Sequence, residues 1–188
     1  MLSNTAAAPR VLVDVLPASR VRDVSLVTGF ALLIAASAQL AIPLPFTPVP
    51  ITGQTLVVLL GAIVLGATRA TAGSLLYIAA GVAGVPWFAV TGGATIGYIV
   101  GFVAAAIVVG AIAQRGLART PLQVAGAMVV GNAVIYAFGA TGLALVVGLS
   151  PTAAITAGIL PFLIGDAIKL AAAVALVPAA WKLLNPER

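Results

Sequence analysis

Two charged residues, Asp166 and Lys169, stand in the otherwise apolar stretch PFLIGDAIKL, residues 161–170. An acid and a base three residues apart share one face of a helix and can form an ion pair. If the stretch crosses a bilayer, each charge costs about 3 kcal/mol on insertion scales, and such residues usually serve a function. A purely structural pair is the alternative, although buried pairs seldom stabilise a fold better than apolar packing does. We therefore expect a polar ligand site, or a proton or ion relay, beside a bend at Pro161.

The composition is that of an integral membrane protein. The 188 residues are 62 % apolar and 7 % charged, and the mean hydropathy is +1.23. Soluble domains carry about 25 % charged residues. Cysteine and histidine are both absent, which excludes disulfides, thiol nucleophiles and Cys/His metal sites and removes the commonest general base. We expect no metal, no cofactor and no enzymatic activity.

The positions of the charges predict six membrane helices. Residues 24–68, 70–114 and 120–165 carry no charge. Each run is about 45 residues long, which is enough for two crossings of about 20 residues and a turn. The expected helices cover residues 24–42, 54–68, 70–84, 96–114, 122–147 and 157–183. The predicted organisation is thus an N-terminal cytoplasmic or interfacial segment (1–23), an all-α membrane domain (24–184) and a short cytoplasmic tail (185–188).

The basic residues predict the orientation in the membrane. All of them except Lys169 fall on one side of the predicted helices, and cytoplasmic loops are the ones that carry Lys and Arg. Both termini are therefore expected in the cytoplasm. The loops opposite carry no charge, and the first of them, PLPFTPVPITG (43–53), has four prolines, which favour extended backbone over helix.

Other polar and aromatic residues lie where they can join the ion pair in one pocket. Asn132 and Tyr136 are four residues apart and share a face of the fifth helix. Trp87 and Tyr98 are each explained well as interfacial anchors, but as a set these side chains describe an amphipathic pocket for a small, mostly apolar molecule with polar ends. The candidate ligand-binding residues are Asp166, Lys169, Asn132, Tyr98, Trp87, Thr91 and Gln54.

Small residues along the helices indicate close helix packing. Most of them are explained by packing within the bundle. Ala31 and Ala35, one turn apart, are expected to face out of the first helix and to dock a partner protein.

Four stretches resemble one known family in order and spacing. AQLAIPLPFTPVPITGQTLVVLLGAIVLG (38–66) carries the strongest likeness, followed by LYIAAGVAGVPWFA (76–89), GATIGYIVGF (93–102) and PFLIGDAIKL (161–170). The chain resembles the BioY family, the biotin-binding S components of energy-coupling factor (ECF) transporters. The likeness runs from about Val24 to Leu184.

The resemblance implies the six-helix S-component fold and high-affinity biotin uptake across the cytoplasmic membrane. It implies a transmembrane coupling protein and an ATPase pair as partners, with a second copy of the chain kept as a further candidate. Asp166 and Lys169 match the family's D-x-x-K motif. Ala31 and Ala35 correspond to the A-x-x-x-A docking motif of S components.

Several alternatives stay open at this point. The pair is expected to grip the urea end of biotin, with Asp166 accepting an N–H and Lys169 donating to the carbonyl, while the carboxylate meets the 92–93 turn and the next helix. The rival assignment sends Lys169 to the carboxylate. An S component for another small vitamin and a solitary, proton-coupled biotin carrier are the competing functions, and an intramembrane enzyme is the weakest.

Overall fold

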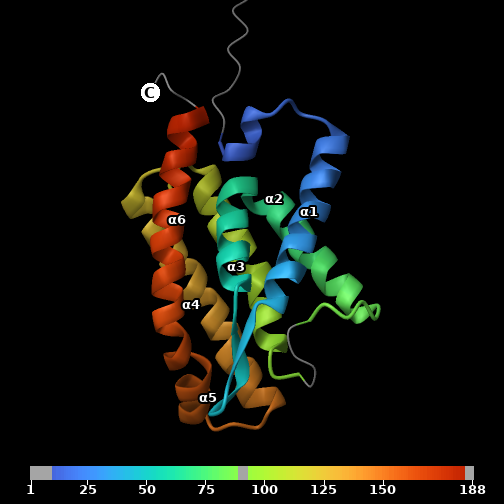
Figure 1. The fold of residues 1–188 in the computed structure, drawn as a ribbon, viewed down its shortest axis with the longest axis vertical. Coiled ribbons are helices and arrows are strands. Elements are labelled where there is room, and N and C mark those ends of the chain that lie inside the picture. Colours follow the sequence, from blue (N-terminus) through green and yellow to red (C-terminus); the bar gives the residue numbers. More distant parts are fainter. Residues whose placement is uncertain (1–9, 89–92, 185–188) are drawn as a thin grey trace, which may run out of the picture.

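The computed structural model describes residues 10–88 and 93–184, and its long helices run roughly along one axis (Figure 1). In chain order the elements are η1 (Leu12–Val15), α1 (Arg20–Gln39), β1 (Ala41–Leu44), β2 (Thr47–Thr52), α2 (Gln54–Val82), α3 (Ile96–Gln114), α4 (Pro121–Val146), α5 (Pro151–Gly158), η2 (Leu160–Phe162) and α6 (Leu163–Leu184). Within the described residues, five helices are long and apolar enough to cross a membrane, with α5 to α6 counted as one. The predicted mostly helical architecture is confirmed.

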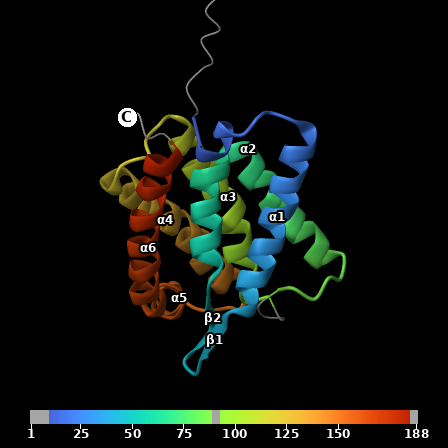
Figure 2. The same cartoon turned by 45° about the horizontal axis from the view of Figure 1, so that its top comes forward.

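The proline-rich stretch after α1 forms a two-stranded antiparallel hairpin of β1 and β2 (Figure 2). Ala41 pairs with Thr52 and Leu44 pairs with Thr47. Both strands of a lone hairpin are edge strands, where a proline without an N–H is tolerated. The predicted extended backbone is therefore confirmed, whereas the prediction of an all-α chain is wrong in this segment.

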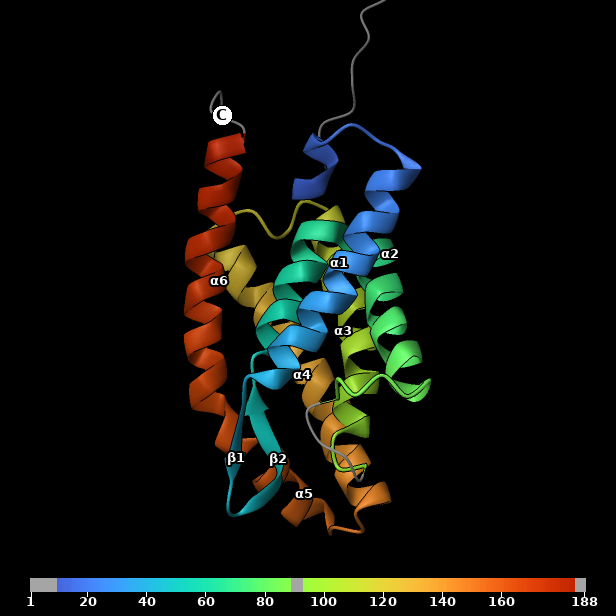
Figure 3. The same ribbon diagram turned by 45° about the vertical axis from the view of Figure 1, so that its right-hand side comes forward.

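Helix α2 is interrupted at Gly66, where the backbone leaves the helical region with φ 78° and ψ 173°. Only glycine adopts this conformation at little cost. The first half of α2 rises towards the end of the bundle that holds η1, and the second half descends from it (Figures 1 and 3). Gly110 of α3 packs directly on this turn, because a Cβ there would overlap the backbone of Ala67. The expected helices 54–68 and 70–84 thus correspond to the two halves of α2.

Helix α1 packs its alanine face inward. The ring of Phe30 lies against Gly61 and Gly73, one from each half of α2, where a Cβ would overlap it. This contact turns Ala31 and Ala35 towards the core, where they are only 1 % and 7 % exposed. The prediction that these two residues face out of the helix is therefore wrong.

The last two helices are separated by the bend that Pro161 predicts. The 3-10 turn η2 joins the short α5 to α6. The Thr47 hydroxyl donates to the carbonyl of Ala157, 2.8 Å away, which ties the hairpin to α5. The hairpin, α5 and the first turn of α6 thus lie at the end of the bundle opposite η1 (Figure 3).

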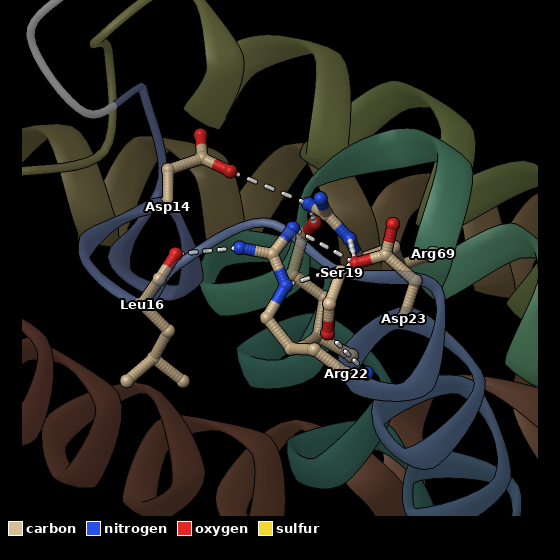
Figure 4. A network of polar contacts seen from close by, with 7 residues as sticks. Asp14, Leu16, Ser19, Arg22, Asp23 and Arg69 are labelled. Atoms are coloured by element: carbon tan, nitrogen blue, oxygen red, sulfur yellow. Dashed lines mark hydrogen bonds and ion pairs between the residues drawn. The ribbon is translucent and has the colours of Figure 1, made fainter. Parts of the chain in front are cut away.

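The end that holds η1 is closed by an ionic network (Figure 4). Arg69 of α2 donates to Asp23 of α1 at 3.0 Å and lies 3.4 Å from Asp14 of η1. Arg22 also pairs with Asp23, at 2.9 Å. The η1 segment buries Leu12 and its two neighbours beneath this network. The network thereby joins η1, the start of α1 and the part of α2 that follows the Gly66 turn.

Candidate functional site

The two intramembrane charges form a buried ion pair near the start of α6. Lys169 Nζ lies 2.8 Å from Asp166 Oδ1, and the two side chains are 16 % and 6 % exposed. The contact that the i, i+3 spacing predicts is therefore confirmed. Partial neutralisation by the partner lowers the cost of keeping each charge away from water.

A threonine from α2 bridges the two charges. The Thr55 hydroxyl donates to Asp166 Oδ1 at 3.1 Å and accepts from Lys169 Nζ at 2.7 Å. One hydroxyl can do both, because it has one O–H and two lone pairs. Thr55 therefore holds the ammonium and the carboxylate in one fixed arrangement.

The second carboxylate oxygen is held from α4. The Tyr136 hydroxyl donates a short hydrogen bond to Asp166 Oδ2. Asp166 is thereby bonded to side chains of α2, α4 and α6, and the residue is 5 % exposed. Hydrogen bonds to an ionised group are stronger than neutral ones, so these contacts both hold the helices together and orient the carboxylate.

The ion pair forms part of the wall of a cavity beneath the hairpin. The cavity and its open mouth together hold about 470 Å³ of empty space. Its lining residues are Val49, Pro50, Thr52, Gln54, Thr55, Thr95, Tyr98, Ile99, Phe102, Tyr136, Phe162, Asp166 and Lys169. Apolar and aromatic walls with a few convergent polar groups are typical of a site for a small amphipathic ligand.

Two other predicted residues line this cavity and are fixed in place. Tyr98 donates to the carbonyl of Gly158 at 2.6 Å. A Cβ at Gly139 would overlap its ring, and a Cβ at Gly158 would overlap its hydroxyl. Gln54 is 5 % exposed and donates to the Tyr77 hydroxyl at 3.0 Å. Both side chains are therefore rigid parts of the wall.

Two of the remaining predicted residues, Trp87 and Asn132, are not among the residues that line the cavity. Trp87 stacks on Tyr77 with ring centroids 5.4 Å apart and donates to the Tyr77 carbonyl. It therefore holds the tyrosine to which Gln54 is hydrogen-bonded. Asn132 lies in a separate groove between α4 and α6. Thr91 falls outside the described residues.

Thr55 and Tyr136 contact Asp166 but are missing from the list of candidate ligand-binding residues, although the sequence places Tyr136 where it can join the ion pair. Tyr136 shares a helix face with Asn132, which marks it as a neighbour but gives no reason to prefer it. Thr55 directly follows Gln54 at the start of α2, and a single threonine in an apolar helix is usually explained by a bond to its own backbone. Both residues reach Asp166 because of the way their helices pack against α6, and the sequence alone does not show this packing.

The hydrogen-bonding capacity left on the pair indicates what it can bind. An ammonium has three N–H donors, and among the described residues Lys169 Nζ meets two acceptors. A carboxylate has about four acceptor positions, of which Thr55, Lys169 and Tyr136 occupy three. Among the contacts of the described residues, one N–H of Lys169 and one acceptor position of Asp166 Oδ2 are thus unused, and a group that has both a C=O and an N–H can meet them. Within the described part of the chain, no cluster of His, Cys, Asp or Glu could hold a metal ion.

The structure is that of a small helical membrane protein with the S-component fold. A crystal structure of the S-component for biotin from an ECF-type ABC transporter superposes with a TM-score of 0.77, covering 88 % of this chain and 95 % of that chain at 19 % identity. At this identity the likeness establishes the fold.

The sequence profile of the BioY family matches residues 8–186, and the chain belongs to the BioY family. It is 37 % identical over 170 residues to the biotin transporter BioY of Rhizobium etli, covering 82 % of this chain and 90 % of the relative. It is 39 % identical over 168 residues to the biotin transporter BioY of Rhodobacter capsulatus, covering 79 % and 87 %.

Removing one partner of the ion pair should destabilise the ligand-free protein more than removing both. Lys169→Met leaves a buried carboxylate without its counter-charge, and we expect a loss of roughly 3 kcal/mol. In Asp166→Leu/Lys169→Met no buried charge remains, so part of that loss should be recovered. Melting temperatures of the purified variants in detergent measure the difference. If the double variant lost as much stability as Asp166→Leu and Lys169→Met lose in sum, the two residues would act independently.

Proposed function

We propose that this chain binds biotin at the Asp166–Lys169 pair and takes it up across the cytoplasmic membrane as the substrate-specific component of an ECF transporter. The observation that carries the proposal is the buried ion pair on the wall of an amphipathic cavity in a chain of the BioY family. The curated relatives named above are biotin transporters. Biotin has a cyclic urea at one end, a carboxylate at the other and an apolar sulfur ring and chain between them, which suits this cavity.

The urea end is the end that the pair binds. Its carbonyl accepts the remaining N–H of Lys169, and one of its N–H groups donates to the remaining position on Asp166 Oδ2. This match uses both unfilled positions and disturbs none of the contacts to Thr55 and Tyr136. The rigid arrangement means that little ordering remains to be done when biotin binds.

The carboxylate end lies towards the start of α3. Thr95, just before this helix, lines the cavity, and Gly93 has a positive φ of 86° in the turn before it. A helix N-terminus presents unpaired N–H groups and a partial positive charge, which favour an anion.

The hairpin is the cover of the site. Val49, Pro50 and Thr52 of β2 form part of the cavity lining. Its prolines keep it stiff, and one hydrogen bond from Thr47 joins it to α5. A stiff cover with few attachments can move as a unit to admit a ligand.

The chain crosses the membrane six times, with both termini in the cytoplasm. The turn at Gly66 divides α2 into two crossings, and the basic residues other than Lys169 mark the end with η1 as the cytoplasmic side. The first half of α2 is only about 18 Å long at 1.5 Å per residue, and the hairpin extends it on the outer side.

Energy for transport comes from other proteins. The sequence contains no phosphate-binding loop that could hold ATP, so a transmembrane coupling protein and an ATPase pair are the expected partners. Because Ala31 and Ala35 are buried, the coupling protein meets other side chains on this part of the surface. Leu32 and Leu33 are the exposed ones on the same turns of α1.

The six-crossing topology predicts opposite labelling of two introduced cysteines. The chain has no cysteine of its own, so Phe46→Cys at the hairpin tip and Leu117→Cys between α3 and α4 each supply one exposed thiol. A membrane-impermeant maleimide applied to intact cells or spheroplasts should label position 46, and position 117 only after lysis. Labelling of both positions from the same side would contradict the topology.

Removal of the site carboxylate should abolish biotin binding while the protein remains inserted. Truncating one member of a buried, hydrogen-bonded charge pair typically costs 2–5 kcal/mol or more, so Asp166→Asn should weaken binding about a hundredfold or more. Asp14→Asn, which alters a carboxylate at the other end of the bundle, is the matched control and should bind normally. Equilibrium binding of radiolabelled biotin to purified protein is the measurement, with riboflavin and thiamine as competitors. Tight biotin binding by a folded Asp166→Asn variant would sink the site assignment.

Biotin methyl ester should distinguish the two orientations of the ligand. If the urea end meets the ion pair, the ester should lose only the contact of the carboxylate with the N-terminus of α3, less than about tenfold in affinity. A loss of about a thousandfold in affinity, about 4 kcal/mol, would instead place the carboxylate on Lys169. Competition against radiolabelled biotin on the purified wild-type chain measures this directly.

A further inference from the structure

The ligand cavity contains a single cation. Among the described residues, Lys169 is the one cation that lines it. The sequence is uncharged from residue 70 to residue 114, so positions 89–92, which lie outside the described residues, add no charge before α3. The other Lys and Arg residues are at positions 10, 20, 22, 69, 115, 119, 182 and 188. Those that the structure describes belong to η1's end of the bundle, at the start of α1, the turn of α2, the end of α3 and the end of α6 (Figure 1).

This cation is fully used by the urea end of the ligand. Lys169 Nζ donates to Asp166 and to Thr55, and the urea carbonyl accepts its third N–H under the proposed function. An ammonium has three donors, so none is left for the carboxylate of biotin. The bicyclic ring and the chain of four methylene groups also hold the carboxylate away from the urea. No cation of this chain therefore pairs with the carboxylate end.

The groups near the start of α3 are neutral. Thr95 lines the cavity there, and the hydroxyl of the nearby Tyr98 donates to the carbonyl of Gly158. A helix N-terminus favours an anion by less than about tenfold in affinity. An ionised carboxylate that is buried without a partner loses far more than this. The carboxylate therefore has to stay in contact with water when biotin binds.

The start of α3 offers that contact. Ile96, the neighbour of Thr95, is 52 % exposed, and Thr95 itself is only partly buried. The cavity has an open mouth. By contrast, the ion pair at the other side of the cavity is buried, with Asp166 only 5 % exposed. The ligand thus has one enclosed end, at the ion pair, and one end near the surface.

We propose that the site also binds biotin amides, in which the carboxylate of biotin is joined to an amine such as the side chain of lysine. This inference rests on the proposed function and on its placement of the urea at the ion pair. The amide keeps the urea, the ring and the chain, and it loses only a charge that no side-chain cation of the protein meets. The amine part extends past Thr95 towards water. Biotinyl-lysine is the ligand of this class that hydrolysis of biotin-carrying proteins would supply.

Competition against radiolabelled biotin on the purified, unaltered chain tests the inference. Biotinamide removes the charge of the tail, and biotinyl-lysine also adds a bulky group beyond it. Both should compete with an affinity within about tenfold of that of biotin. Acetyl-lysine, which has the same lysine part without the biotin ring, is the control and should not compete.

A pair of threonine variants tests where the carboxylate lies. Thr95→Arg adds a cation to the cavity wall and should raise the preference for biotin over biotinamide at least tenfold, because an arginine binds a carboxylate through charge-assisted hydrogen bonds. Thr152→Arg adds the same charge at an exposed position of α5 that does not line the cavity, and it should leave the preference unchanged. An unchanged preference in a folded Thr95→Arg variant would overturn the placement of the carboxylate.

The competition on the unaltered chain decides the inference even if Thr95→Arg does not fold. A loss of more than tenfold for biotinamide would show that the protein recognises the charge of the carboxylate. A loss of that size for biotinyl-lysine alone would show that this end of the cavity is closed. Either result, with tight binding of biotin itself, would overturn this inference alone. Absence of biotin binding by the unaltered chain would instead overturn the proposed function.

Discussion

The Asp166 carboxylate is the point at which the helices of this fold meet. It accepts hydrogen bonds from Thr55 of α2, Tyr136 of α4 and Lys169 of its own helix α6. In lipid, apolar side chains gain little by leaving the solvent for one another, so packing and interhelical hydrogen bonds determine which helix faces meet. A buried carboxylate that must be satisfied from three directions therefore fixes the rotation of all three helices about it, and with it the shape of the cavity.

The other features of the fold give this carboxylate its surroundings. The turn at Gly66 sends the second half of α2 back towards the end of the bundle that holds the hairpin (Figure 3), so the two halves of α2 bring Gln54 and Tyr77 into contact. The break at η2 separates α5 from α6. Helix α5 is hydrogen-bonded to the hairpin through Thr47 and to α3 through Tyr98. Each interruption of a helix is thus used to form one wall of the cavity.

The sequence predicts the parts of this arrangement that depend on the order of residues along the chain. Charge-free runs locate the helices, prolines locate the hairpin and the bend, and the D-x-x-K spacing locates the ion pair. It does not predict which face of one helix meets which face of another. Alanine suits both lipid and a neighbouring helix, so Ala31 and Ala35 are assigned to the wrong side. For the same reason, the sequence leads to the choice of Asn132, which lies in the groove between α4 and α6, and not of Thr55, which contacts both charges.

An ion pair suits a binding site inside a membrane because it remains satisfied when no ligand is present. A lone charge in the same place would carry its full desolvation cost in the empty state. A neutral amide would keep that cost low but would bind a urea through weaker hydrogen bonds. The pair in this chain keeps its charges and is still largely satisfied without a ligand. Side chains of the protein occupy three of the acceptor positions of the carboxylate and two of the N–H groups of the ammonium. Under the proposed function, the remaining donor and the remaining acceptor are the groups that bind the urea of biotin.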